Sequence, residues 1–302
     1  MNNYFELNIS INPEMEEIIS DIFFTNFDCE GVVLEEETYK DLEMTSTTRG
    51  KLRVFLVSYP NNLNEILSTE RELMKSRGLT DEDLGSWEIT IDEKENQDWS
   101  KKWKEKWTVT HVTDKIAVVP SWLEYEPKED EITITLDPGC AFGTGTHQTT
   151  QLCMKALEKY LKKGDSVADI GTGSGILAIL AKKLGASKVY GCDIDETVID
   201  VCKKNAVVNG VNGVNGELVF ELNTADKITE QFDFVCANIL HFVLAEIMGD
   251  LKNITKQKGL ISLSGILNEK KDMVLEAIKR ENLEIVDTLV QDQWISYVVQ
   301  KI

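Results

Sequence analysis

The sequence predicts an α/β protein in which a small α+β domain precedes a doubly wound parallel sheet. Its 302 residues suffice for two domains of ~150 residues each. Beyond about residue 147 the apolar pattern alternates between helix and strand periods, as it does where helices connect parallel strands. The chain ends in two successive strands, 284–290 and 294–300, which predict an antiparallel hairpin at one edge of that sheet. Residues 1–95 follow the order βαββαβ, the split-βαβ plan of a ferredoxin-like domain.

The elements of the first domain follow from alternation and from helix boundaries. Alternating apolar residues predict strands at 4–11, 31–34, 52–57 and 87–91. One helix begins at Pro13, a residue favoured in the first turn, and runs to about Phe24. A second helix covers 63–77 and stops at Gly78.

The larger domain, 109–302, is predicted in the same way. Strands are expected at 116–119, 132–136, 166–170, 188–193, 217–222, 233–237 and 259–264, besides the final hairpin. Helices are expected at 149–161, 175–184, 195–208, 241–252 and 269–281. Three Asn-Gly pairs within 209–216 predict a loop.

A tryptophan stripe lies between the two domains. Trp99, Trp103 and Trp107 recur every four residues and mark one face of a linker helix at 96–108. Such a face could stack on bases, but it more often packs against a domain. We therefore expect a docking helix.

Composition excludes several classes of protein. No apolar run reaches the ~18–20 residues of a membrane span, and the first basic residue is Lys40, so the N-terminus lacks the basic flank of a secretory signal. The six cysteines include no C-x-x-C pair, and the three histidines have no Cys or carboxylate at ligand spacing. These features predict a cytoplasmic protein with reduced thiols, no membrane contact and no metal site.

The net charge is strongly acidic. The chain carries 52 Asp and Glu against 32 Lys and Arg, a formal charge of −20, and residues 1–95 alone hold 22 against 8, a charge of −14. An acidic surface repels phosphate backbones, so we expect no direct contact with nucleic acid. The acidity serves solubility or steers a basic partner protein, and charge alone favours solubility.

A glycine turn is the strongest motif for chemistry. Gly171, Gly173 and Gly175 follow Asp169 where a strand turns into a helix, the place where open α/β sheets bind nucleotides. The next strand ends in Asp193, 22 residues beyond Gly171, where a carboxylate can accept hydrogen bonds from ribose hydroxyls. The alternative is a tight turn without a ligand.

The spacing of this turn favours one type of ligand. Ile176 stands at the last position of the dinucleotide fingerprint G-x-G-x-x-G/A, so the turn reads G-x-G-x-G instead. The acidic Asp169 disfavours a pyrophosphate. It suits S-adenosylmethionine, which has no phosphate and carries a cationic sulfonium and an amino group.

Two further segments belong to the same edge of the sheet. Asn238 ends a strand, where its amide oxygen could accept a hydrogen bond from an amine or could cap the following helix; spacing does not decide between these roles. The Gly- and Thr-rich segment 137–150 is a lid over a ligand or a domain junction, and its position before the glycine turn favours a lid. His147 within it could have a catalytic role, but hydrogen bonding at the start of a helix explains it equally well.

The motifs occur in a characteristic order: Asp137-Pro-Gly-x-Ala-Phe-Gly-Thr-Gly-Thr-His-x-Thr-Thr150, Gly171-x-Gly-Ser-Gly-Ile-Leu-Ala178, Asp193-Ile-Asp195, Ala237-Asn-Ile-Leu240 and Leu263-Ser-Gly-Ile-Leu267. Asp98-Trp99-x-x-x-Trp103 and Pro120-Ser-Trp122 accompany them. With these motifs the chain resembles, over essentially its whole length, the bacterial methyltransferases that modify ribosomal large-subunit protein eleven. The glycine turn is shared by all class I methyltransferases, whereas the first and last motifs are more specific.

The resemblance implies a class I methyltransferase (Rossmann-like) domain after a substrate-recognition domain at 1–95. It implies methylation of lysine ε-amino groups and of the N-terminal α-amino group of that basic ribosomal protein. The family's S-adenosylmethionine contacts carry over to Thr150, Gly171, Asp193 and Asn238. The sequence departs from the family at Cys140, Gln148 and His241, where Leu, Pro and a small residue are usual.

For the reaction itself we assign the alignment of the amine to Asn238 and the carbonyl of Ile239. Methyl transfer from a sulfonium to an amine needs nitrogen, methyl and sulfur in line. Two other functions are considered. A methyltransferase for nucleic-acid amines could use the same asparagine, but the charge of −20 argues against it. A ribosome-binding factor without activity would not bind S-adenosylmethionine.

Overall fold

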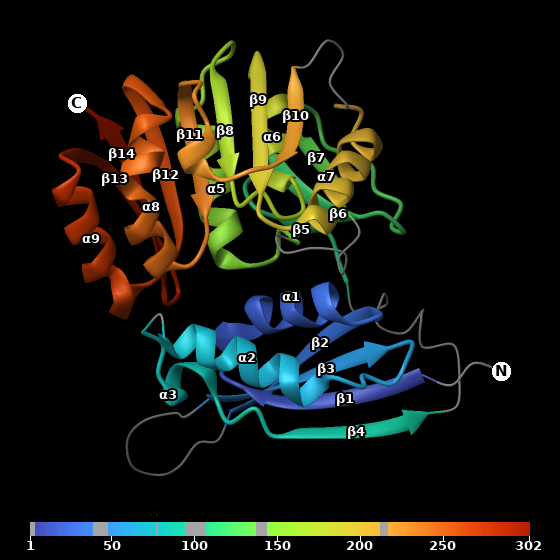
Figure 1. Ribbon diagram of the computed structural model, residues 1–302. Helices are drawn as coiled ribbons and strands as arrows, with labels where there is room; N and C mark the ends of the chain where they lie inside the picture. The colour runs from blue at the N-terminus through green and yellow to red at the C-terminus, as the bar shows by residue number, and fades with distance from the viewer. Residues whose placement is uncertain (1–3, 39–47, 77, 95–106, 137–143, 212–216) are drawn as a thin grey trace. The chain divides into compact units, whose positions relative to one another are not determined.

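The computed structural model describes residues 4–38, 48–76, 78–94, 107–136, 144–211 and 217–302 (Figure 1). The chain divides into two compact units, one within residues 1–107 and one that begins at Thr108. The predicted linker helix lies outside the described residues except for Trp107 and Thr108, as does the part of the predicted lid at 137–143.

The first unit is an antiparallel sheet with helices. Its elements are β1 (Tyr4–Ile11), η1 (Pro13–Met15), α1 (Glu16–Asn26), β2 (Cys29–Thr38), β3 (Thr48–Leu56), α2 (Leu63–Ser76), α3 (Asp81–Leu84) and β4 (Ile89–Lys94). The strand order is β2-β3-β1-β4, and all neighbours are antiparallel. This is the order in which a βαββαβ chain places its first and third strands at the centre.

The core of this unit explains its local structure. Leu7 and Ile9 alternate along the central strand β1 and are fully buried, as is Phe23 of α1.

The short helix α3 was not predicted, although the sequence contains the capping signal for its start. Thr80 and Asp83 form a capping box, in which the Thr80 hydroxyl accepts from the Asp83 N–H and the Asp83 carboxylate accepts from the Thr80 N–H.

The second unit contains the predicted doubly wound sheet. Its strands are β8 (Ser166–Ile170), β9 (Lys188–Asp193), β10 (Leu218–Leu222), β11 (Phe232–Asn238), β12 (Thr255–Leu267), β13 (Leu283–Gln291) and β14 (Trp294–Lys301). The order β10-β9-β8-β11-β12-β14-β13 can be followed in Figure 1. The first five strands are parallel, and β14 pairs antiparallel with both β12 and β13. The antiparallel C-terminal hairpin is therefore confirmed.

Helices and a second small sheet complete this unit. The helices are α5 (Gln148–Tyr160), α6 (Ile176–Lys183), α7 (Glu196–Val208), α8 (His241–Asn253) and α9 (Lys271–Arg280), with the 3-10 turns η4 (Ala225–Lys227) and η5 (Asn268–Lys270). The predicted strands near 116 and 132 are β6 (Ile116–Pro120) and β7 (Ile132–Leu136). In a separate sheet, β6 pairs with β7 on one side and with β5 (Thr110–His111), which was not predicted, on the other.

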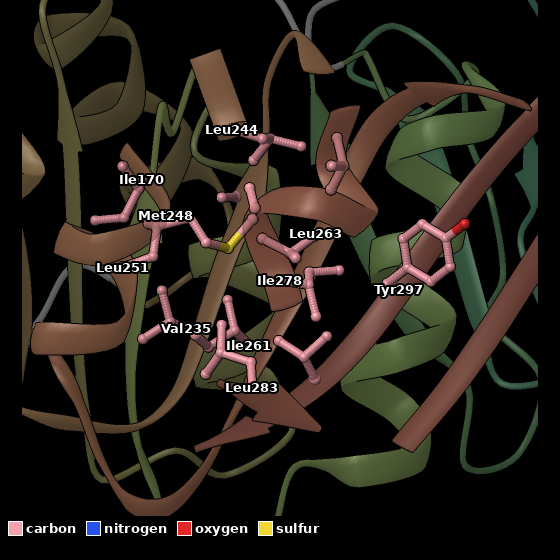
Figure 2. Packing of buried hydrophobic residues seen from close by; sticks show 14 of the residues in the cluster. Ile170, Val235, Leu244, Met248, Leu251, Ile261, Leu263, Ile278, Leu283 and Tyr297 are labelled. Atoms are coloured by element: carbon pink, nitrogen blue, oxygen red, sulfur yellow. The ribbon is translucent and has the colours of Figure 1, made fainter. Parts of the chain in front are cut away.

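The residues of β12 alternate between the two faces of the large sheet. Ile261 and Leu263 belong to the apolar cluster in which α8, α9 and the hairpin pack together (Figure 2). Ser262 and Ser264 face the other way, and their hydroxyls donate to Cys153 Sγ and to the Thr149 carbonyl of α5. The carboxyl end of β12 is thereby fixed against the start of α5.

The described cysteines and helices can be compared with the expectations from composition. The five described cysteines are free thiols, and four of them are buried. None of the helices in the described part of the chain is long and apolar enough to cross a membrane.

Candidate functional site

The glycine turn joins β8 to α6 in a left-handed backbone path. Gly171, Gly173 and Gly175 have φ of 69°, 52° and 80°, values that L-residues with a side chain rarely adopt. The Gly171 N–H donates to the Cys192 carbonyl of β9, at 2.9 Å. The turn therefore lies at the carboxyl ends of the parallel strands, where the sequence predicted it.

Asp193, the last residue of β9, is hydrogen-bonded to this turn. Its Oδ2 accepts from the Gly173 N–H at 3.1 Å, and its Oδ1 accepts from the N–H groups of Ile194 and Asp195 at 2.8 and 3.2 Å. Burial raises the pKa of the carboxyl, and these three N–H groups oppose the increase. Among the described residues Oδ2 has one donor, so it retains accepting capacity for a ligand hydroxyl.

Asp169 lies beneath the same turn and is almost completely buried. Its Oδ2 accepts from the Thr172 hydroxyl at 2.7 Å and from the Ala178 N–H at 3.2 Å. Its Oδ1 has no hydrogen-bond partner among the described residues. Burial raises the pKa of this carboxyl to about 7, so that a nearby cation would strongly favour its ionised form.

Asn238 ends β11 and contacts α5 rather than α8. Its Nδ2 donates to the Thr150 hydroxyl at 3.1 Å, and its Oδ1 is buried without a partner in the described part of the chain. The N-cap position of α8 is Leu240, with no side-chain capping bond. The alternative that Asn238 caps the following helix is therefore wrong. The amide hydrogen bond to Thr150 leaves the oxygen for another donor.

Thr150 is positioned by the start of α5. Thr149 and Thr150 are buried, and the preceding His147 is the N-cap residue, whose Nδ1 accepts from the Thr149 N–H at 3.3 Å. The His147 ring packs edge-on against Trp294 of the hairpin, with centroids 4.8 Å apart, and burial lowers its pKa to about 4. His147 thus acts at a helix start, one of the two roles considered for it.

Ile239 contacts the glycine turn. A Cβ added to Gly171 would lie 2.4 Å from Ile239 Cγ2, so only glycine permits this approach. Of the predicted site residues, Thr150 and Asn238 meet through a hydrogen bond, Gly171 and Ile239 meet by packing, and Asp193 is bonded to the same turn through Gly173. All five come together within the second unit.

The residues that depart from the family pattern have structural contacts. Gln148 donates from Nε2 to Asp292 Oδ2 in the hairpin, at 3.3 Å. His241 is buried, and its ring packs edge-on against Phe242. Cys140 lies outside the described residues.

The unpaired groups define what the site can hold. Two buried acceptors, Asp169 Oδ1 and Asn238 Oδ1, have no partner within the described ranges, and they match a ligand that carries N–H donors or a positive charge. The Asp193 carboxylate matches a ribose. The residues present therefore fit S-adenosylmethionine, which has these groups. No group of three or more His, Cys, Asp and Glu side chains suited to a metal ion occurs among the residues that the structure describes.

Comparison with known proteins decides the family. The family model described as "Ribosomal protein L11 methyltransferase (PrmA)" matches residues 3–302. The chain belongs to this family. The ribosomal protein L11 methyltransferase of Caldicellulosiruptor saccharolyticus is 35% identical over 311 residues, which cover 99% of each chain. That of Anoxybacillus flavithermus is 36% identical and covers 98% of each chain.

A solved structure of the family agrees with the fold. The ribosomal protein L11 methylase of Lactobacillus delbrueckii subsp. bulgaricus is 33% identical, with a TM-score of 0.60. The match covers all of that chain and 65% of this one. The PrmA family therefore accounts for the order of the sequence motifs and for the class I fold of the second unit.

Proposed function

We propose that this chain transfers methyl groups from S-adenosylmethionine to amino groups of ribosomal protein L11, both lysine ε-amino groups and the N-terminal α-amino group. Membership of the PrmA family over residues 3–302 is the observation that carries this proposal. The unpartnered acceptors of Asp169 and Asn238 support it independently, because they suit a cationic ligand and an amine. We therefore also propose a cytoplasmic location, which a ribosomal substrate supports.

Three regions of the site would hold the cofactor. Asp193 would accept from the ribose, and the glycine turn at Gly171 would let the backbone approach closely. Asp169, ionised once a cation lies nearby, would favour the positively charged end of the molecule. When bound, S-adenosylmethionine supplies an electrophilic methyl group on a sulfonium that leaves as a neutral thioether.

Asn238 and Ile239 would orient the acceptor amine. Lysine has an ordinary pKa of about 10.4, so its ammonium group must first lose a proton. Ile239 is partly exposed, and the proton would leave to solvent there. The Asn238 Oδ1 and the Ile239 carbonyl would then accept two N–H groups of the neutral amine and direct its lone pair at the methyl group. The N–C bond forms as the S–C bond breaks.

The role of the first domain follows from charge. Residues 1–95 carry −14 of the total charge of −20, while the five site residues lie beyond residue 149. A basic ribosomal protein would be attracted to that acidic surface. We assign substrate recognition to residues 1–95.

The rival substrate is ribosomal RNA, whose bases also carry amines. The enzyme would be incubated with intact ribosomal subunits and methyl-labelled S-adenosylmethionine, and the product divided between nuclease and protease digestion. We expect label that protease releases and nuclease does not. Label that nuclease releases would show that RNA, and not protein, is the substrate. The absence of both methyl transfer and cofactor binding would indicate a ribosome-binding factor without activity.

A further inference from the structure

The end of β12 contains a bulge next to the proposed amine site. Leu263 pairs with Tyr297 of β14, whereas Ile266 pairs with Ile295, so β12 has one residue more than its partner between these pairs. The residue at the bulge, Gly265, has a left-handed φ of 85°. Opposite it, the buried Ser296 hydroxyl donates to the Leu263 carbonyl at 2.8 Å.

The bulge brings the Cα atom of Gly265 against the backbone of Ile239. A Cβ added at Gly265 would lie 2.2 Å from the Ile239 carbonyl oxygen and 2.8 Å from its carbonyl carbon. An N–H donor to that oxygen has its nitrogen about 2.9 Å away. A side chain at position 265 would therefore crowd the space from which a donor reaches the oxygen.

Exposure differs between the residues around this contact. Gly265 and Ile239 are both partly exposed, whereas Asn238, Ser264 and Ile266 beside them are buried. The close contact between Gly265 and Ile239 therefore joins two residues that solvent partly reaches, among neighbours that it does not reach.

We propose that Gly265 is a positioning residue for methyl transfer: its missing side chain leaves the Ile239 carbonyl accessible to the acceptor amine. This inference rests on the proposed function. The same bulge positions the opposite wall of the site, because the adjacent Ser264 hydroxyl donates to the Thr149 carbonyl at 2.9 Å. The β12 segment therefore contacts both α5, through Ser264, and the residue that follows β11, through Gly265.

A different explanation is that only the backbone conformation requires glycine here. Gly164 separates the two explanations, because its φ of 94° is also left-handed but an added Cβ would meet nothing within 4 Å. Gly164→Ala therefore introduces comparable backbone strain without crowding. Gly265→Asn is the second variant, because asparagine tolerates a left-handed conformation better than alanine.

The test uses the full-length chain with L11 as acceptor. Wild type, Gly164→Ala, Gly265→Ala and Gly265→Asn would be compared by kcat, by the dissociation constant of S-adenosylmethionine from calorimetry, and by thermal melting. We expect both Gly265 variants to lose at least tenfold in kcat while cofactor affinity stays within about threefold. Gly164→Ala should keep wild-type kcat.

Each other outcome has a definite meaning. Gly265 variants with the kcat of Gly164→Ala would overturn the inference, and so would a parallel loss of cofactor affinity or the failure of both Gly265 variants to melt cooperatively. If wild type itself does not methylate L11, the proposed function fails first, which is a distinct result.

Discussion

The carboxylate of Asp193 accepts three backbone N–H groups, one from the glycine turn and two from the residues that follow β9. The sequence predicted Asp193 at the end of the second parallel strand, 22 residues beyond Gly171, and β9 does end at this residue. The hydrogen bond to Gly173 could not be predicted, since it depends on the left-handed path of the turn. The sequence pattern also could not predict that one side-chain oxygen of Asp169 and one of Asn238 are buried without a partner among the described residues, because burial depends on the tertiary structure.

Asp193→Ala should weaken cofactor binding. Loss of a charge-assisted acceptor costs about 1.5–3 kcal/mol, which corresponds to about a 10- to 150-fold lower affinity by calorimetry. Asp193→Asn is the control, because it keeps one acceptor oxygen at the same position and should bind with intermediate affinity. Unchanged affinity in a folded Asp193→Ala protein would contradict the assignment.

Asn238→Ala should reduce turnover more than cofactor affinity. Its Oδ1 is proposed to orient an amine that gains charge as the methyl group is transferred, a hydrogen bond of about 1.5–3 kcal/mol or 10- to 150-fold in kcat. We also expect some weakening of cofactor binding, because the variant loses the hydrogen bond that Asn238 donates to Thr150, an expected cofactor contact. Steady-state kinetics and calorimetry on the same preparation separate the two effects. Wild-type kcat would remove Asn238 from the reaction.

At the scale of elements, the start of α5 shows how the C-terminal hairpin supports the site. The hairpin contributes Trp294, which packs on His147, and Gln291, whose Oε1 accepts from Lys155 Nζ at 2.7 Å. Leu152 of α5 also packs with Trp294 and Leu267 in one small apolar cluster. The hairpin therefore positions the helix that carries Thr150.

His147→Asn tests this element through pH. The folded pKa of His147 is about 4, below its ordinary 6.5, because the buried ring resists protonation. Its contribution to the free energy of unfolding is complete above pH 6.5 and is lost as pH falls toward 4, by at most about 3 kcal/mol. Asparagine keeps an N-cap acceptor but does not titrate.

Urea unfolding of wild type and His147→Asn across pH 4 to 7.5 gives the comparison. The stability of wild type relative to the variant should fall steadily as pH decreases through this window. Two curves that run parallel would show that His147 is not held neutral by burial in the folded protein.

Elements were predicted well where periodicity was strong and less well where local geometry intervened. The helix expected at 195–208 is α7 at 196–208, because its apolar face and its Asp195 cap are both encoded locally. The strand expected at 259–264 is β12 at 255–267. Lys256-Gln-Lys-Gly259 has the composition of a turn, and the register of β11 and β12 is in fact irregular there, with Lys258 at a φ of 64°. Pattern alone cannot show that pairing resumes beyond such an irregularity.

At the scale of the whole molecule, the unequal distribution of charge and motifs is the main feature. Every predicted site residue lies in the second unit, whereas most of the net negative charge lies in residues 1–95. Alternating periods and the glycine turn were enough to predict the class of the larger fold. The predicted linker helix and its tryptophan face stay a prediction, since most of that segment lies outside the described residues.

A protein reduced to residues 108–302 should bind S-adenosylmethionine but lose methylation of L11. The cut follows the boundary between the two compact units, and thermal melting would first establish that the shorter chain is folded. In the full chain, KM for L11 should rise with salt, because exposed charges are screened beyond ~8 Å at physiological ionic strength. A folded 108–302 protein that methylates L11 at the full rate would contradict the recognition role.

The most direct test of the central claim is mass spectrometry of purified ribosomal protein L11 after incubation with the enzyme and isotopically labelled S-adenosylmethionine. We expect intact L11 to gain mass in steps of one labelled methyl group, and we expect fragmentation to place these groups on lysine side chains and on the N-terminal amine. The Asn238→Ala variant, under the same conditions, should give far less product. An unchanged mass of L11 with active, cofactor-binding enzyme would contradict the claim.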